Sequence, residues 1–163
     1  MSKEIRAGIA NWFLQKGYLW PAALYYLQQC KEGYADLDVK GKVVLDIGAD
    51  WGNSSLYWWL RGATKIIAYE ANPFCEGPIS TLQEQGLPID FRGVWDGDYP
   101  DADVLKVDIE GKEADFRMLY LGRYDQWAFA THSNTFWMEP KLLDLGGRLA
   151  HEQDGERVWV KTL

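Results

Sequence analysis

The chain is poor in cysteine, histidine and proline, and acidic residues outnumber basic ones. Of its 163 residues two are Cys, two are His and six are Pro. Two cysteines are too few for a disulfide framework, so reduced thiols in a cytoplasmic protein are the simpler interpretation. The 17 Lys and Arg against 24 Asp and Glu give a net charge of −7. That charge disfavours broad contact with phosphate backbones, and we expect no nucleic-acid partner.

Long hydrophobic runs are also missing. No stretch approaches the roughly 18 uninterrupted apolar residues of a membrane span, and the start, MSKEIRAGIANW, lacks the apolar core of a signal peptide. We therefore expect a cytoplasmic protein without membrane contact. The chain is 47% hydrophobic and 25% charged, which is ordinary for a globular protein. Its length predicts a single domain over residues 1–163.

The first part of the chain has helical spacing of apolar residues. Residues 1–32 are predicted to be helical, with a break at Gly17 and a second helix beginning at Pro21, and residues 1–40 should cover the core formed by 41–163. Many aromatic side chains occur here: Trp12, Phe13, Tyr18, Trp20, Tyr25 and Tyr26. They either pack these helices on a sheet or form the wall of a ligand site.

From residue 41 onward, short apolar runs alternate with helical segments. The predicted strands are 42–47, 65–71, 89–94, 103–109 and 127–132, and the predicted helices are 53–61, 78–85, 113–121 and 136–145. Asn53 or Ser54 is expected to cap the first of these helices. Two final strands are joined by Asp154-Gly155, which suits a two-residue hairpin turn. This order predicts an α/β fold with a Rossmann-like, doubly wound, mostly parallel sheet and a C-terminal antiparallel hairpin.

One connection of this predicted sheet is unusually short. Only the nine residues WDGDYPDAD separate Val94 from Val104, too few for a regular covering helix. One face of the sheet is then left for the N-terminal helices or a second subunit, so a homodimer is an open alternative.

Polar residues follow the predicted strands where ligands bind in such folds. Asp46, Glu70, Asp108 and His132 each end a strand, and Glu110 comes just after one. Because the carboxyl ends of parallel strands meet at one edge of the sheet, these side chains should gather around a ligand.

The loop after the first strand does not favour a phosphate. Starting from Gly48, a dinucleotide-binding loop would have glycine at the first, third and sixth positions, but the chain has Gly48, Asp50 and Asn53. Asp50 would also repel a pyrophosphate at the helix N-terminus. The loop therefore favours a ligand that is cationic or carries an amino group.

Glu70 follows the second strand, 22 residues after Gly48. An acid at this position accepts hydrogen bonds from the two hydroxyls of a ribose. A ribose without a phosphate indicates S-adenosylmethionine, whose sulfonium and amino groups favour nearby carboxylates.

Two segments resemble a known family. VVLDIGADWGNSSLYWWLRGATKIIAYEANP resembles motif I and the following strand of class I S-adenosylmethionine-dependent methyltransferases, and DVLKVDIEGKEADF is similar to a signature of the FkbM-like members. The resemblance covers about residues 41–135. It implies the following cofactor-binding residues: Asp46, Gly48, Asp50 and Gly52 on the methionine side, Glu70 at the ribose, and Asn72 and Trp95 near the adenine. Asp50 stands where these enzymes usually have Gly or Asn.

The chemistry of methyl transfer to a hydroxyl needs a base near the acceptor. Asp108, Glu110 and His132 are the candidates, although His132 could simply cap its strand. The three could form an oxygen and nitrogen cluster, but no pair of His or Cys has metal-ligand spacing, so we expect no required metal. The prediction is a small methyltransferase acting on oxygen of a small-molecule or glycan acceptor. The alternative is a non-catalytic Rossmann-like module that binds the cofactor or serves as a partner subunit.

Overall fold

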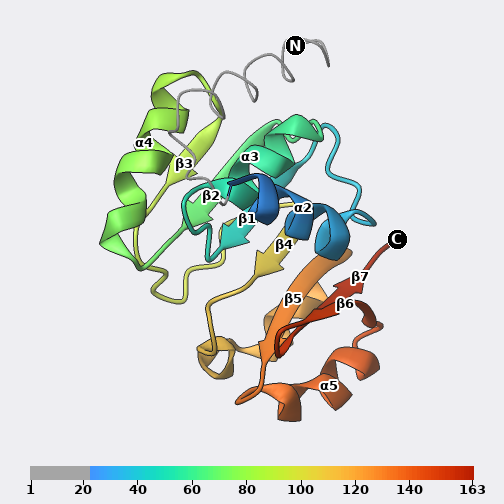
Figure 1. Cartoon of the computed structure of the whole chain (residues 1–163). Coiled ribbons are helices and arrows are strands. Elements are labelled where there is room, and N and C mark those ends of the chain that lie inside the picture. Colours follow the sequence, from blue (N-terminus) through green and yellow to red (C-terminus); the bar gives the residue numbers. More distant parts are fainter. Residues whose placement is uncertain (1–22) are drawn as a thin grey trace.

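The computed structural model describes residues 23–163, which contain a seven-stranded sheet with the order β3-β2-β1-β4-β5-β7-β6 (Figure 1). The strands are β1 Val43–Ile47, β2 Lys65–Tyr69, β3 Ile89–Phe91, β4 Val104–Val107, β5 Gln126–His132, β6 Arg148–Gln153 and β7 Glu156–Lys161. The pairings among β1 to β5 are parallel, whereas β7 is antiparallel to both β5 and β6. The predicted fold class is confirmed. The strand order reverses between β1 and β4, where such sheets bind ligands.

The helices are α2 Ala23–Tyr34, α3 Asn53–Leu60, α4 Glu76–Glu84 and α5 Glu139–Asp144, with short 3-10 helices η1 Pro73–Cys75, η2 Glu113–Asp115, η3 Met118–Arg123 and η4 Phe136–Met138. None of the helices in this part of the chain is long and apolar enough to cross a bilayer. The predicted helix before residue 17, and Trp12, Phe13, Tyr18 and Trp20 of the predicted aromatic wall, lie outside the described residues.

Two helix predictions were wrong in detail. The segment 113–121 is not one helix, because Phe116 and Arg117 are extended and separate η2 from η3. Phe116 is buried against the sheet. The N-cap of α3 is Gly52, with no side-chain hydrogen bond. The hydroxyl of Ser54, one of the predicted caps, donates instead to Asp46.

Alternate residues of the central strands pack on opposite faces of the sheet. One face is covered by α2, α3 and α4, which Figure 1 shows beside the strands. The strand residues of that core include Val44, Ile66, Val104, Ala128 and Val158. The opposite core contains Leu45, Ile67, Leu105, Trp127 and Trp159, together with Leu142 of α5 and residues from the segment 95–124. Burial on both faces explains why the strands are nearly continuous apolar runs.

An aromatic cluster covers the part of the second face that lacks a long helix. The rings of Trp95 and Phe116 stack with centroids 5.6 Å apart, those of Tyr99 and Tyr120 stack at 3.9 Å, and Phe116 meets Phe129 of β5 edge-on at 5.5 Å. The short connection predicted to leave this face open therefore contributes to covering it from within the chain. A second subunit is not needed for that purpose, and a homodimer stays a prediction.

The cluster predicts a large effect of removing its central ring. Phe116→Ala should lower the free energy of unfolding by about 3–5 kcal/mol, because the side chain is buried and its neighbours cannot fully refill the space. Denaturant unfolding followed by tryptophan fluorescence measures the change. Leu119→Ala is the matched control, because Leu119 lies in η3 but is 85% exposed, and it should change stability by less than about 0.5 kcal/mol. Equal effects of the two substitutions would contradict this role of the cluster.

Candidate functional site

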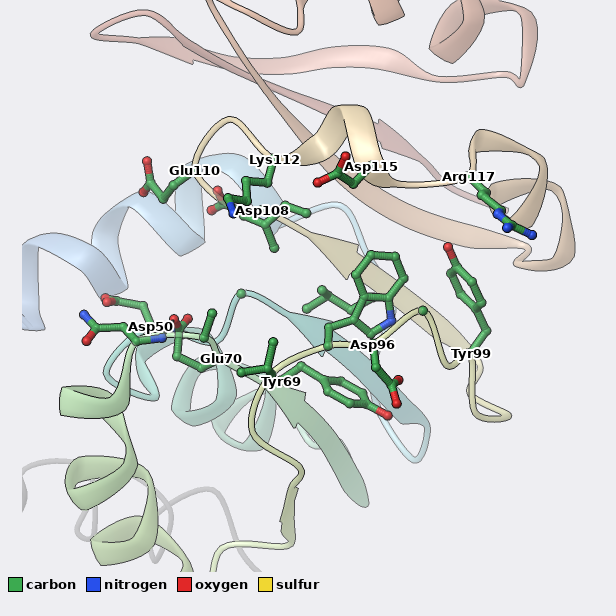
Figure 2. A pocket seen from close by; sticks show the side chains of 18 of the residues that line it. Asp50, Tyr69, Glu70, Asp96, Tyr99, Asp108, Glu110, Lys112, Asp115 and Arg117 are labelled. Carbon is green, nitrogen blue, oxygen red and sulfur yellow. Dashed lines mark hydrogen bonds between the residues drawn. The ribbon is translucent and has the colours of Figure 1, made fainter.

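A cavity of about 1020 Å³ opens at the carboxyl ends of β1, β2 and β4 (Figure 2). It is lined by five of the predicted cofactor residues and two of the predicted catalytic ones: Gly48, Asp50, Glu70, Asn72, Trp95, Asp108 and Glu110. Asp46 and Gly52 do not line it. Residues that the sequence analysis did not select also contribute: Asp96, Tyr99, Lys112, Asp115, Arg117 and Tyr120. Asp96 lies directly after Trp95, so the same strand-end argument could have found it.

A buried ion pair lies beneath this cavity. Lys106 of β4 is the register partner of Asp46 of β1, and its ammonium Nζ lies 3.4 Å from Asp46 Oδ1 and 3.8 Å from Asp108 Oδ2. The same group donates to the carbonyl of Gly48. Burial alone would lower the pKa of Lys106, but Asp46 and Asp108 raise it above its usual range. Lys106 is therefore a fixed cation that ties β1, β4 and the glycine loop together.

Asp46 supports the loop from below. Its side chain is fully buried, and its Oδ2 accepts hydrogen bonds from the hydroxyls of Ser54 at 2.7 Å and Ser55 at 3.0 Å. Burial raises the pKa of Asp46, while Lys106 and the two serines lower it. The carboxylate thus fixes the start of α3 relative to β1. Asp46 was predicted to bind the cofactor on its methionine side. It lines neither cavity described here and supports the loop from beneath instead.

Gly48 has no room for a side chain. Its φ is 83°, and a Cβ atom there would lie 1.6 Å from the backbone oxygen of Asp108. Such a close approach of the loop to the end of β4 requires glycine. Gly52 is also closely packed, because a Cβ atom would lie 2.6 Å from Leu82 of α4. It therefore acts in packing at the start of α3.

The carboxylate of Glu70 is held by backbone groups. Its Oε2 accepts from the amide of Asp50 at 2.9 Å, and its Oε1 accepts from the amide of Asn72 at 2.7 Å. A carboxylate has about four acceptor positions, so both oxygens keep capacity for a further donor. Figure 2 shows Asp50 and Glu70 together on one wall, with Asp108, Glu110 and Lys112 across the cavity. The predicted proximity of Glu70 to the glycine loop is thus present in the structure.

Acidic residues predominate around the cavity. Its lining contains the carboxylates Asp50, Glu70, Asp96, Asp108, Glu110 and Asp115 but only two cationic side chains, Lys112 and Arg117. Such a lining attracts a cation or a donor of several hydrogen bonds and repels phosphate. Burial also raises the pKa of Asp50.

His132 lies at the end of β5, behind the cavity. Its Nδ1 is 3.1 Å from Oε1 of the buried Glu113, and its Nε2 is 3.5 Å from Glu110 Oε2 and 3.9 Å from Asp108 Oδ1. The hydrogen bond to Glu113 and the charges of the three acids raise the pKa of His132 to about 9. At neutral pH the imidazole is therefore protonated in this network, and it cannot accept a proton until it has lost one.

A second cavity of about 100 Å³ adjoins the first between α2 and the β6–β7 hairpin. The two share Gly48, Asp50, Asp108 and Glu110. The hydroxyl of Tyr34 in the smaller cavity donates to Asp108 Oδ2 at 3.3 Å. Burial raises the pKa of Glu156 there to about 7 and that of the Cys30 thiol to about 12. A thiol with that pKa is not a nucleophile at neutral pH.

Two viral proteins are related to this chain along most of its length. Uncharacterized protein 65 of Sulfolobus islandicus filamentous virus (isolate Iceland/Hveragerdi) is 32% identical over 130 residues, which cover 78% of each chain. Uncharacterized protein 158B of Sulfolobus islandicus rod-shaped virus 1 is 34% identical over 122 residues, covering 72% of this chain and 75% of the relative. The chain belongs to their family. No family model matches it.

Several solved structures with a similar fold are methyltransferases or contain S-adenosyl-L-methionine. A Pyrococcus horikoshii protein assigned as an RNA methyltransferase has a TM-score of 0.61 at 18% identity, covering 87% of this chain and 84% of that one. Aeropyrum pernix fibrillarin, solved with bound S-adenosyl-L-methionine, has a TM-score of 0.59 at 17% identity, and the match covers 84% of this chain and 72% of fibrillarin. The C-terminal domain of precorrin-6Y C5,15-methyltransferase from Rhodobacter capsulatus has a TM-score of 0.59 at 17% identity, and the match covers 82% of this chain and 85% of that domain. These likenesses show the fold of this chain, and the resemblance to FkbM-like enzymes stays a prediction.

The buried ion pair between Lys106 and Asp46 predicts a large contribution to stability. Lys106→Met should lower the free energy of unfolding by about 3–5 kcal/mol, because it leaves Asp46 charged and buried without its partner. Chemical denaturation measures the loss, and adding Asp46→Asn to Lys106→Met should recover part of it. Lys65→Met is the control. Its exposed pair with Asp90 at 3.2 Å should contribute less than about 1 kcal/mol. A similar loss in both single variants would contradict the assignment.

The environment of His132 predicts its titration. In metal-free buffer, NMR should show one of the two imidazoles titrating near pH 9 instead of near its ordinary 6.5, and His132→Gln should remove that signal. Because the folded pKa is raised, the ion pairing of His132 stabilises the fold fully below about pH 6.5. That stabilisation is lost as the pH rises through about 9. A titration midpoint of His132 at or below pH 6.5 would show that Glu113 does not stabilise the protonated imidazole.

Proposed function

We propose that this protein transfers a methyl group from S-adenosylmethionine to an oxygen atom of an acceptor. The observation that carries the proposal is Glu70, whose two carboxylate oxygens are fixed by backbone amides at the edge of a large cavity opposite Asp108. A carboxylate oriented in this way can accept both hydroxyls of a ribose without further rearrangement. The fold, shared with methyltransferases, supports the same assignment.

The lining of the cavity suits each part of this cofactor. The amino and sulfonium groups carry positive charge, which Asp50 and Asp108 on either side of Gly48 would favour. Trp95 and Asp96 after β3 offer a flat surface and an acceptor for the amino group of an adenine, and both line the cavity. A volume of about 1020 Å³ lies at the upper end of ordinary small-molecule sites, which leaves room for an acceptor beside the cofactor.

The reaction would be an in-line displacement at the methyl carbon. The acceptor oxygen attacks that carbon, the carbon–sulfur bond breaks, and its electron pair stays on sulfur, giving S-adenosylhomocysteine. The acceptor proton leaves to a base. Asp108 and Glu110 line the cavity as candidates, while His132 holds a proton at neutral pH and can act only after losing it. Alignment of the two reactants supplies most of the rate gain.

We further propose a small-molecule or glycan acceptor. The acidic lining supports this, because an RNA acceptor would bring phosphates close to Asp108, Glu110 and Asp115. Two observations weigh against a small-molecule or glycan acceptor. Several of the similar structures are assigned as RNA or tRNA methyltransferases, and Lys112 and Arg117 provide a local cationic edge at the rim. Methylation assays with a glycan panel and with RNA distinguish these acceptors.

A non-catalytic module that binds the cofactor is the second candidate. All three proposed catalytic residues take part in one ion-pair network, so none of the three is a base without an ion-pair partner. Cofactor binding without turnover across both acceptor panels would favour this candidate.

Cofactor binding is the direct test. Calorimetry should show S-adenosylhomocysteine binding to the folded protein, and Glu70→Gln should weaken it by about 1.5–3 kcal/mol, the value of hydrogen bonds to a charged group. This corresponds to roughly 10- to 150-fold in affinity. Glu76→Gln is the control, because exposed Glu76 in α4 lies outside the cavity. A folded wild-type protein that binds no ligand at millimolar concentration would rule out the proposal.

A further inference from the structure

We propose that Asp108, Glu110 and His132 form a binding site for one divalent cation of the Mg²⁺ or Mn²⁺ type. One ligand atom from each side chain lies within 4.8 Å of the others. The sequence indicates a possible oxygen and nitrogen cluster of these three residues, but it does not predict a required metal, because they have no recognised metal-ligand spacing. The fold creates it by placing the ends of neighbouring strands β4 and β5 together.

The distances are close to those of a coordinated ion. His132 Nε2 lies 3.5 Å from Glu110 Oε2 and 3.9 Å from Asp108 Oδ1. Adjacent ligands of an octahedral ion with bonds of about 2.1 Å are about 3 Å apart. The three ligand atoms, within 4.8 Å of one another, must approach by up to about 2 Å to reach this spacing. The Glu110 side chain, 88% exposed, is free to turn toward the ion.

His132 is oriented as a metal-binding histidine usually is. Such a residue binds with one ring nitrogen and donates from the other to a carboxylate behind it. Here Glu113 occupies that rear position, with Oε1 3.1 Å from Nδ1. Glu113 is fully buried, and the same oxygen accepts from the amide of Ile109 at 2.9 Å. This fixed carboxylate leaves Nε2 directed at Asp108 and Glu110. An ion bound at Nε2 takes the place of the proton on that nitrogen, which is released to solvent.

Asp108 has one oxygen engaged and one available. Oδ2 accepts from the Tyr34 hydroxyl at 3.3 Å and lies 3.8 Å from the Lys106 ammonium. Oδ1 is buried, and it accepts no hydrogen bond from the described residues. His132 Nε2, at 3.9 Å, is too far to satisfy it. A cation between Asp108 and His132 would supply the missing partner of this oxygen.

The donor set selects the kind of ion. Two carboxylates and one imidazole favour Mg²⁺ or Mn²⁺ over ions that prefer thiolates, and three protein ligands leave other coordination positions for water or a ligand oxygen. Asp108 and Glu110 line the large cavity, so an acceptor hydroxyl there could bind the ion and lose its proton more readily. That role rests on the proposed methyl transfer, whereas cation binding itself does not.

Electron paramagnetic resonance of Mn²⁺ with the full, metal-free chain tests the site. We expect one Mn²⁺ bound with a dissociation constant below about 1 mM, and a loss of at least about tenfold in Glu110→Gln and in His132→Gln. Asp115→Asn is the matched control, because it removes a negative charge from the same cavity without touching the three ligands. It should change Mn²⁺ affinity less than about twofold.

The outcomes separate this proposal from the previous one. Glu110→Gln alters an exposed side chain and should fold normally, which thermal melting checks. If wild-type protein shows no saturable Mn²⁺ binding, or if Glu110→Gln and Asp115→Asn weaken it equally, the site is overturned. Glu70→Gln should lose S-adenosylhomocysteine affinity and keep Mn²⁺ binding. Failure of the cofactor to bind would therefore not imply failure of the cation site.

Discussion

The ammonium group of Lys106 is the interaction on which the site depends. It is buried between Asp46 and Asp108, next to the smaller cavity, and donates to the carbonyl of Gly48. One cation thereby joins the two central strands at the point where strand order reverses. It also fixes the loop that forms the floor of the cavity. Since a buried charge is costly without partners, loss of any one of these groups would destabilise the others, and together they hold the loop and β4 in place beside the cavity.

The small number of cationic groups also determines the charge of the site. Lys106 and His132 each lie near two or more carboxylates, so the cavity keeps an excess of negative charge. A sulfonium cofactor and a divalent cation are both positively charged, and both would be attracted by this acidic lining, with Asp108 close to each of them. The two proposals are therefore compatible in one protein, and both follow from the charge deficit that the composition already shows.

Much of the fold followed from residue patterns, and the failures have physical causes. Apolar runs such as 42–47 predicted β1 because a strand buried on both faces must be apolar throughout. The helix predicted over 113–121 was wrong because spacing alone does not reveal that Phe116 turns into an aromatic cluster with Trp95 and Tyr99. Those partners lie about 20 residues away, in the connection that was expected to leave the sheet face uncovered.

For the site, the sequence by itself determined which residues end the strands: Gly48, Glu70, Asp108 and His132 follow directly from local patterns. Tertiary structure decided what each one faces. It buried Asp46 beneath the loop, gave Glu70 its two amide donors, and placed Glu113 behind His132. Side-chain orientation and proton affinity depend on neighbours brought from distant parts of the chain, and a linear pattern contains no information about those neighbours until the strands pair.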